Sequence, residues 1–328
     1  MMLYLLYVLI AAVLILLELI YFRIADRFNI IDRPNKRSSH TFITLRGGGV
    51  VFPLAMCCYI ICFGMIYPLF FLGLLLAGVV SFIDDVHPLP NWIRVVAQFA
   101  AMILLMLECG DMLIWHNWYI VALGLITCVG IVNAYNFMDG INGITGGYSF
   151  AVLASLWVMN SKVPFIDPLF LAVASISVLV FCWFNYRTRP KCFAGDVGAV
   201  SIAFIVLFAL TRLILKTGDW TYLFFLAVYG ADSIMTIVHR IYLRENIFLP
   251  HRKHLYQLMA NELHIPHTVV SSIYIALQGL ISAGLIWLPM NNVLYCAILF
   301  VLLIVVYVAF IKRYYYLHEQ ATKKITKE

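Results

Sequence analysis

Charged residues are scarce in this chain: Asp, Glu, Lys and Arg make up 12% of its 328 residues, whereas 64% are hydrophobic. The mean hydropathy is +0.95. A soluble globular domain carries roughly twice that share of charged residues, so the composition excludes one. No polar stretch is long enough to fold as a separate soluble domain. We therefore expect an integral membrane protein.

Metal and redox motifs are also missing. The eight cysteines form no CxxC pair, and no His is spaced from them as a zinc ligand would be. Most of them lie inside apolar runs, where Cys acts as a small packing residue. The sequence has no internal repeat and no low-complexity segment. These absences argue against a zinc domain, a redox protein and a transporter built from repeats.

What the chain does contain is a series of apolar runs. Each of eleven runs is about 15 to 22 residues long and is bounded by charge, Pro or Gly, and such helices cross a hydrocarbon core roughly 30 Å thick. They are too long, and alternate too little, for barrel strands. The predicted fold is all-α, one polytopic membrane helix bundle over residues 1–328. The runs lie at 2–22, 48–67, 69–83, 93–108, 118–135, 144–160, 165–184, 198–215, 221–238, 268–289 and 293–311.

Lys and Arg predict the orientation of this bundle. Nineteen of the 22 basic residues fall on one side of the eleven predicted spans, and only Lys162, Arg212 and Lys216 fall on the other. By the positive-inside rule the amino terminus lies outside, and residues 313–328 form a basic cytoplasmic tail. The first run lacks a basic n-region and a small-residue cleavage site, so we expect a retained helix and not a secretory signal.

The least expected polar residues lie at the end of the run at 118–135. Asn133, Asn136 and Asp139 are spaced three apart, so on a helix they share one face. Polar side chains beside lipid are costly unless they meet water, a metal or a substrate. The following Asn142-Gly143 is typical of capping and turns, which does not explain Asn133 and Asn136. The segment is a candidate site.

Two further clusters precede it on the cytoplasmic side. Arg46 leads into Gly47-Gly48-Gly49 at the start of a run, and glycines there let backbone N–H groups approach a phosphate; a positive-inside anchor is the alternative. Asp84 and Asp85 are adjacent carboxylates, which persist where a cation or a proton transfer needs them. A charge pair at a helix end without a role is the alternative for these two.

Two clusters follow it. Asp196 stands between Gly195 and Gly198 at a predicted helix start, where a carboxylate can cap the helix or bind a metal beside a phosphate. Residues 251–257 are dense in His and Arg, which suits a diphosphate; a zinc site is the rival. Asp232 lies inside a run, and we expect it to pair with a cation such as Arg240 or to have a structural partner.

Taken together, these clusters resemble, in order and over nearly the whole chain, the polyprenyl-phosphate N-acetylhexosamine-1-phosphate transferases. That family belongs to glycosyltransferase family 4 and shares a superfamily with phospho-N-acetylmuramoyl-pentapeptide transferase. Tyr256-Gln257 after the second His is similar to the branch that initiates O-antigen. The loop between His40 and Arg46 departs from the family, because Ile43 and Leu45 stand where prolines are common. The matching pieces are Asp32-x-Pro-Asn-x-Arg37-Ser-Ser-His40, Arg46-Gly-Gly-Gly49, Asp84-Asp85, Asn133-x-x-Asn136-x-x-Asp139-Gly140, Gly195-Asp196-x-Gly198 and His251-Arg252-x-His254-x-Tyr256-Gln257.

The resemblance implies an enzyme of the bacterial inner membrane with its active site on the cytoplasmic face. It would transfer an N-acetylamino-sugar 1-phosphate from a UDP-sugar to undecaprenyl phosphate, release UMP and initiate a surface polysaccharide such as O-antigen. It implies Mg²⁺, with Mn²⁺ as a substitute, and no nucleic-acid partner. A homodimer is left open, as is the identity of the amino sugar.

The resemblance also implies a role for each matching position. Asp196 and Asn136 would bind the metal ion, while Asp84, Asp85 and Asp139 would act on the lipid phosphate. The remaining positions would bind substrate, namely Arg37, His40, Arg46, Asn133, Asn142, His251, Arg252 and His254.

Three other classes of membrane protein place acids in an apolar bundle. A proton- or ion-coupled transporter is the alternative function, but transporters favour midplane sites on broken helices, whereas these acids lie at helix ends. The Asp-Gly-x-x-Ala-Arg signature of CDP-alcohol phosphotransferases is missing. An intramembrane aspartyl protease needs two acids that meet within the membrane, which adjacent residues at a helix end do not provide.

Overall fold

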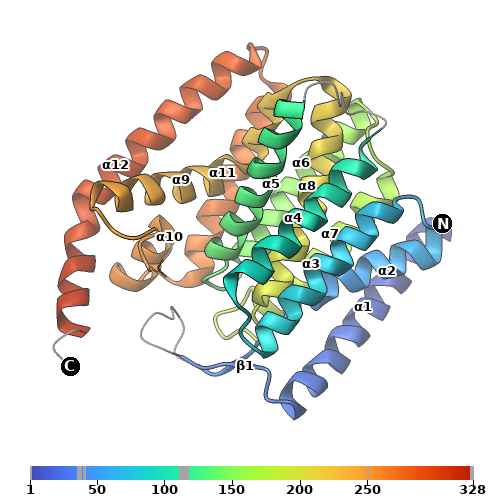
Figure 1. The fold of residues 1–328 in the computed structure, drawn as a ribbon, viewed down its shortest axis with the longest axis horizontal. Helices are drawn as coiled ribbons and strands as arrows, with labels where there is room; N and C mark the ends of the chain where they lie inside the picture. The colour runs from blue at the N-terminus through green and yellow to red at the C-terminus, as the bar shows by residue number, and fades with distance from the viewer. Residues whose placement is uncertain are drawn as a thin grey trace.

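The protein is a bundle of long helices (Figure 1). The computed structural model describes residues 2–34, 39, 42–110, 118–247, 249 and 251–325, the last five by their backbone. Helices occupy all eleven apolar runs, which confirms an all-α, multi-pass membrane architecture. Their bounds are α1 Met2–Arg27, α2 Val51–Phe63, α3 Pro68–Val86, α4 Asn91–Glu108, α5 Trp118–Met138, α6 Ile144–Lys162, α7 Pro168–Asn185, α8 Gly195–Thr217, α9 Ala227–Tyr242, α11 His267–Trp287 and α12 Asn292–Ile325.

Short elements complete the described chain. A 3₁₀ turn, η1 (Gly48–Val50), leads into α2, and another, η2 (Trp220–Leu226), leads into α9. The brief α10 (Leu255–Gln257) continues as the π turn η3 (Leu258–Glu262). The first loop holds a small antiparallel hairpin that the sequence did not predict, in which β1 (Ile31–Asp32) pairs with β2 (Thr44–Leu45).

Helix α8 is the centre of the bundle. In the most apolar stretch of α8, 83% of the residues are buried, whereas in the corresponding stretch of α12 the share is 11%. Helix α8 contacts α2, α3, α5 and α6, so these four helices are placed relative to one another by one shared neighbour. Because the active-site candidate Asp196 stands in the first turn of α8, the central helix also determines where the polar end of the bundle lies.

Local sequence signals explain where several helices begin and end. Pro68 and Pro168 open α3 and α7, where a missing N–H costs nothing. Asp167 caps α7 by accepting from the backbone N–H of Leu169. Gly218 ends α8 in the left-handed region, at φ 68°.

Nine of the described helices are long and apolar enough to cross a membrane. Helix α6 is not among them, and the apolar stretch Gly48–Phe63 is shorter than the rest. The prediction of eleven spans therefore stays a prediction. Helix α12 extends beyond the apolar run predicted at 293–311 and continues to Ile325.

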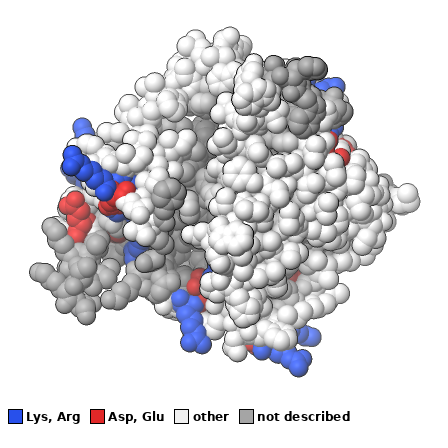
Figure 2. Space-filling view, viewed as in Figure 1, with Lys and Arg blue, Asp and Glu red and all other residues white. Residues whose placement is uncertain are grey.

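Charged side chains are sparse on the outer face of the bundle that Figure 2 draws. In the face drawn in Figure 2, Lys, Arg, Asp and Glu lie toward the rim, and the broad centre carries none. The hairpin, α10 and the end of α12 lie at the lower side of Figure 1. Backbone hydrogen bonds join these loops: Phe193 N–H donates to Leu45 C=O, and Arg46 N–H donates to Ile30 C=O. The predicted polar clusters are therefore gathered at one end of the bundle.

Candidate active site

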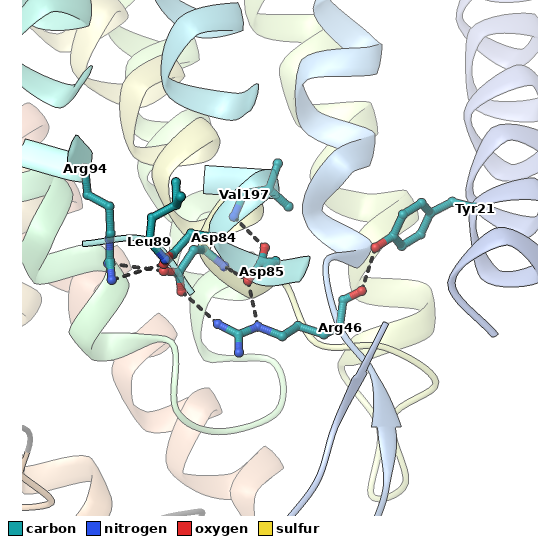
Figure 3. Close-up of polar contacts among 8 residues, drawn as sticks. Tyr21, Arg46, Asp84, Asp85, Leu89, Arg94 and Val197 are labelled. Carbon is teal, nitrogen blue, oxygen red and sulfur yellow. Dashed lines mark hydrogen bonds and ion pairs between the residues drawn. The ribbon is translucent and has the colours of Figure 1, made fainter. Parts of the chain in front are cut away.

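Five charged side chains form the centre of that end, and we call them the carboxylate cluster: Asp84, Asp85, Asp196, Arg46 and Arg94 (Figure 3). They come from α3, α4, α8 and the segment before η1. Residues more than a hundred positions apart in the sequence meet here. The sequence had predicted each acid separately, and the fold brings all three together.

Both carboxylate oxygens of Asp85 accept hydrogen bonds from other groups of the protein. Its Oδ1 accepts from the backbone N–H of Asp196 over 2.9 Å and from Arg46 Nε over 2.6 Å, while Oδ2 accepts from Val197 N–H over 2.9 Å. A carboxylate in this position caps the positive end of α8. Its side chain has no exposed surface. Asp85 therefore fixes the first turn of α8 against the end of α3.

A glycine is needed where Asp85 meets α8. Gly195 has φ +71°, and a Cβ there would lie 2.5 Å from Asp85 Oδ2 and 2.9 Å from Gly47 Cα. Both the conformation and the close approach exclude a larger residue. The Gly195-Asp196 pair in the sequence thus marks the capping contact, in addition to any role of Asp196.

Asp196 receives both guanidinium groups. Arg46 Nη2 lies 3.3 Å from its Oδ1, and Arg94 Nη2 lies 3.1 Å from its Oδ2. Arg94 also reaches Asp84 Oδ2 over 3.1 Å, and Asp84 Oδ1 accepts from Leu89 N–H over 2.6 Å. Each arginine therefore bridges Asp196 to one of the paired acids. With all five groups ionised, the cluster carries one formal negative charge.

Asn136 completes this arrangement from α5. With its amide oriented to satisfy both neighbours, Nδ2 donates to Asp196 Oδ1 over 3.2 Å and Oδ1 accepts from Arg94 Nη2 over 2.9 Å. The two residues predicted as metal ligands, Asn136 and Asp196, are thus in direct contact. Arg94 was not among the predicted site residues. Its signal in the sequence was a single cation at the start of an apolar run, four residues before Gln98.

Asn133 lies one turn further into the bundle and has protein partners. Its Nδ2 donates to Gln98 Oε1 over 2.9 Å and to Val129 C=O over 2.8 Å. The pairs Asn136–Arg94 and Asn133–Gln98 therefore form two successive contacts between α4 and α5. This placement gives Asn133 a helix-packing role, and its predicted contact with substrate stays a prediction.

Asp139 stands just beyond the end of α5. The Thr145 hydroxyl donates to its Oδ1 over 2.6 Å. Burial raises the pKa of Asp139 to about 6, although the Thr145 hydrogen bond opposes that shift and the Asp85 charge adds to it. A carboxyl that titrates near neutral pH is suited to taking up or releasing a proton.

The glycine run after Arg46 does not form the phosphate cradle that we expected. Gly48 N–H donates to Phe193 C=O and Gly49 N–H donates to Ala194 C=O, so neither is available to an anion. A Cβ on Gly49 would lie 2.1 Å from Gly198 Cα. These glycines instead allow the backbone before α2 to pack directly on the first turn of α8.

Asn142 is likewise held within the protein. Its side chain, only 3% exposed, donates to Arg187 C=O, and its own C=O accepts from Ser271 Oγ. Asn185 binds the adjacent turn, because its Oδ1 accepts from Gly143 N–H. Asn142 thus joins its own turn to the loop after α7 and to α11, and its predicted contact with a nucleotide stays a prediction.

Residues 251–257, which we call the histidine loop, are organised by Asp232. The Asp232 carboxylate accepts from the backbone N–H groups of Leu255 and Tyr256 and from the Tyr274 hydroxyl, and its Oδ1 lies 3.3 Å from His254 Nδ1. Asp232 does not pair with Arg240, and the alternative, a structural partner, is what the structure shows. Arg240 binds Glu245 and the carbonyls of Asn246, Ile247 and Leu249, because it lies a further two turns along α9.

The histidine loop lies against the end of α5. Tyr256 Oη donates to Phe137 C=O over 2.9 Å, and the His251 ring is 6.4 Å from the Phe137 ring. Burial lowers the pKa of His251 to about 3, with the nearby His254 and Arg240 lowering it further. His251 is therefore a neutral imidazole at neutral pH, able to donate one hydrogen bond. This contact brings the loop beside the segment that carries Asn136 and Asp139.

The remaining predicted site residues are placed as follows. Arg252 Nη2 lies 3.9 Å from Glu262 Oε1. Arg46 is in the carboxylate cluster, where the charges of Asp85 and Asp196 outweigh burial and raise the pKa of its guanidinium. The predictions for Arg37 and His40 lie outside the described residues.

The fold and this site together define a polytopic membrane protein with an ionic site at one end of its bundle. The model of glycosyl transferase family 4 matches residues 67–214, which include Asp84, Asp85, Asn136, Asp139 and Asp196. Over this stretch the chain is similar to that family. Arg46 and the histidine loop lie outside the matched stretch.

Curated relatives agree with this assignment. A Bacillus subtilis (strain 168) protein named as a probable undecaprenyl-phosphate N-acetylglucosaminyl 1-phosphate transferase is 25% identical over 260 residues, 73% of this chain and 72% of its own length. The undecaprenyl-phosphate alpha-N-acetylglucosaminyl 1-phosphate transferase of Escherichia coli (strain K12) is 28% identical over 268 residues, 72% of this chain and 71% of its own. That of Yersinia pestis is 24% identical over 261 residues, with the same coverage.

Proposed function

We propose that this protein transfers an N-acetylamino-sugar 1-phosphate from a UDP-sugar to undecaprenyl phosphate. An oxygen of the lipid phosphate forms a bond to the β-phosphorus of the UDP-sugar. The bond from that phosphorus to the oxygen bridging the α-phosphate breaks, and UMP leaves. The product is an undecaprenyl-diphosphate sugar, the starting lipid of a surface polysaccharide such as O-antigen. The names of the relatives support the lipid acceptor and the sugar phosphate.

The observation that carries the proposal is the contact of Asp196 with two guanidinium groups and Asn136. Transfer of a phosphoryl group between two anions needs neutralisation of charge and alignment more than covalent help. An excess of carboxylate with oxygen donors attracts a cation, while Arg46 and Arg94 can bind phosphate oxygens once they leave Asp196. The cluster therefore supplies both kinds of charge that the reaction needs.

The donor set fits Mg²⁺, with Mn²⁺ as a substitute. Asp196 and Asn136 offer carboxylate and carboxamide oxygens, the ligands that Mg²⁺ prefers. Within the described part of the chain, no three His, Cys, Asp or Glu side chains form a complete metal cage. That suits an ion that keeps waters and binds substrate phosphates through its remaining positions. When bound, Mg²⁺ neutralises the charge that develops on the diphosphate.

The paired acids divide their tasks. Both oxygens of Asp85 are already hydrogen-bonded, because they accept from two backbone N–H groups and from Arg46 Nε. The Asp84 carboxyl contacts Leu89 N–H, Arg94 and Asp196, and its side chain is 7% exposed whereas that of Asp85 is fully buried, so Asp84 is the acid that contacts the lipid phosphate. Asp139, with its pKa of about 6, is the nearby group that can hold the proton of that phosphate.

The histidine loop would hold the diphosphate of the donor. His251, Arg252 and His254 provide hydrogen-bond donors, and Arg37, His40 and Arg46 would assist from the first loop. Asn142 keeps its predicted contact with substrate as part of this proposal, whereas Asn133, which binds Gln98, supports the packing of α4 on α5. We further propose eleven membrane spans, with the amino terminus outside and the active site on the cytoplasmic face of the bacterial inner membrane, because nineteen of 22 basic residues then lie inside.

A donor panel tests the proposed function. Purified protein is given undecaprenyl phosphate and Mg²⁺ with UDP-GlcNAc, UDP-GalNAc, UDP-QuiNAc or UDP-FucNAc, and UMP and lipid product are measured. We expect equal amounts of UMP and lipid-diphosphate sugar with at least one donor, and none without the lipid. Absence of UMP with every N-acetylhexosamine donor would overturn the proposal.

A further inference from the structure

The cytoplasmic end of α12 presents one face to the rest of the protein. Tyr307 is 4% exposed and His318 is 8% exposed, whereas Tyr316 between them is 53% exposed. Tyr307, Tyr315 and His318 are separated by eight and three residues, a spacing that puts them on one side of a helix. Since Tyr316 is turned away, this end of α12 packs through a defined stripe.

The stripe contacts the elements that carry the histidine loop. Tyr307 Oη lies 3.2 Å from Thr236 Oγ1 on α9, and Thr236 in turn donates to Asp232 over 3.1 Å. The Tyr315 ring lies 4.6 Å from the His239 ring. In Figure 1 the lower end of α12 runs beside α10, and it contacts both α10 and η3.

Two contacts reach the loop or its neighbour directly. Lys253 Nζ lies 5.6 Å from the centre of the Tyr315 ring, a cation–π distance. His318 Nδ1 lies 2.9 Å from Glu262 Oε1, and the same oxygen lies 3.9 Å from Arg252 Nη2. The Glu262 side chain is only 4% exposed. Arg252 and Lys253 are therefore both held from the side of α12.

The His251 ring lies against α5 and not against α12. Its Nδ1 is buried and has no hydrogen-bond partner in the described part of the chain, and its ring faces Phe137 at the end of α5. The loop is thus fixed at Arg252, Lys253 and His254, on the side of α9 and α12. The ring of His251, the first residue of the loop, therefore lies beside the end of α5 that carries Asn136.

We propose that the end of α12 is a brace for the histidine loop, in which Tyr315, His318 and Glu262 are positioning residues for the diphosphate of the sugar nucleotide. This inference rests on the proposed function for the identity of the ligand. The brace acts through Lys253 and Arg252 and makes no contact with substrate. Loss of the brace would free the loop and weaken donor binding, while the carboxylate cluster and the site of the lipid phosphate would keep their geometry.

Two matched pairs of variants test the brace. Tyr315→Ala removes the ring that faces Lys253, and Tyr316→Ala removes the neighbouring exposed ring. His318→Ala removes the partner of Glu262, and Glu319→Ala changes the exposed residue beside it. Tyr315→Phe keeps the ring. Amide hydrogen exchange is followed over residues 245–257 in the full-length protein, and kcat and KM are measured for donor and lipid separately.

We expect faster exchange over residues 245–257 in Tyr315→Ala and His318→Ala, and a KM for the donor raised about tenfold, as for other supporting contacts. The KM for the lipid should stay unchanged, and Tyr315→Phe, Tyr316→Ala and Glu319→Ala should resemble the wild type. Unchanged exchange in both Tyr315→Ala and His318→Ala would overturn the brace.

Faster exchange with an unchanged donor KM would overturn the positioning role and would remove the histidine loop from the donor site. Failure of the proposed function is distinguishable from both results. In that case the wild type would release no UMP from any UDP-sugar, while the exchange measurement would still report whether α12 holds the loop.

Discussion

The two polar regions at the basic end of the bundle are built in opposite ways. In the carboxylate cluster, each acid meets a guanidinium group within 3.3 Å, and Asp85 also accepts two backbone N–H groups. In the histidine loop, His251 Nδ1 and His254 Nε2 are buried without a hydrogen-bond partner among the described residues. Leaving a buried polar atom unpaired costs about 1–3 kcal/mol.

This difference in hydrogen bonding indicates a different role for each region. The carboxylate cluster is held together by its own arginines, which leave one formal negative charge, so it keeps its shape before substrate arrives. A cation that binds at Asp196 would have to displace them. The histidine loop is held by Asp232 and Glu262, and in our proposal its ring nitrogens bind a ligand. One region is preorganised by paired charges, and the other is preorganised by a scaffold around unpaired ring nitrogens.

The largest expected effect is a difference between substitutions of Asp84 and Asp85, the two adjacent acids of the carboxylate cluster. Asp85→Asn breaks a buried pair with Arg46 and weakens the cap on α8, so we expect a loss of about 3–5 kcal/mol in stability together with activity. Asp84→Asn should lose activity with a smaller loss of stability, because Asn can still accept from Leu89 N–H. Thermal unfolding and UMP release measure the two effects. An Asp85→Asn protein that melts like the wild type would contradict the capping role.

In the histidine loop, we expect a change in binding and not in stability. His251→Ala should raise the KM for the UDP-sugar about tenfold or more, since a hydrogen bond to a charged group contributes about 1.5–3 kcal/mol. His264→Asn is the matched control, because His264 is exposed and has φ 54°, a conformation that Asn tolerates. An unchanged KM in His251→Ala would remove the imidazole from the donor site.

The pH dependence should report Asp139, which lies between the two regions. If its carboxylate takes the proton of the lipid phosphate, kcat/KM falls as the pH drops through about 6, the pKa that burial gives this group. Thr145→Val removes a hydrogen bond that favours the ionised form, so the acidic limb should move to higher pH, whereas Thr145→Ser should preserve it. Identical limbs in the wild type and Thr145→Val would argue against Asp139 as the titrating group.

The smallest effect is expected at Asn133. Asn133→Ala removes one contact between α4 and α5, worth about 1 kcal/mol of stability, and should leave both KM values unchanged. Thermal unfolding and steady-state kinetics distinguish the outcomes. A KM raised severalfold without a loss of stability would restore the predicted contact with substrate.

The sequence predicted the helices better than their ends. All eleven apolar runs are helical because their length and hydropathy leave few alternatives. The continuation of α12 to Ile325 was missed because Lys312 and Arg313 end the apolar run, although charged residues with long side chains are good helix formers. Hydropathy marks where a helix leaves the lipid and not where it stops.

The site was predicted as a set of residues and not as a geometry. Asp84 and Asp85 look equivalent in sequence, but successive side chains point about 100° apart on a helix, so only one of them turns fully toward α8. Glycines permit close approach of either an anion or another backbone, and Gly49 meets the backbone of Gly198. Arg94 was missed because a cation at a helix end is ordinarily an anchor.

The central claim is that Asp196, with Asn136, binds the metal ion that neutralises the donor diphosphate. The direct measurement is UMP release at increasing Mg²⁺ by the wild type, Asp196→Asn and the exposed control Asp26→Asn. We expect Asp196→Asn to lose activity on the order of a hundredfold to a thousandfold and to stop responding to Mg²⁺, while Asp26→Asn matches the wild type. Full Mg²⁺-dependent activity in Asp196→Asn would contradict the central claim.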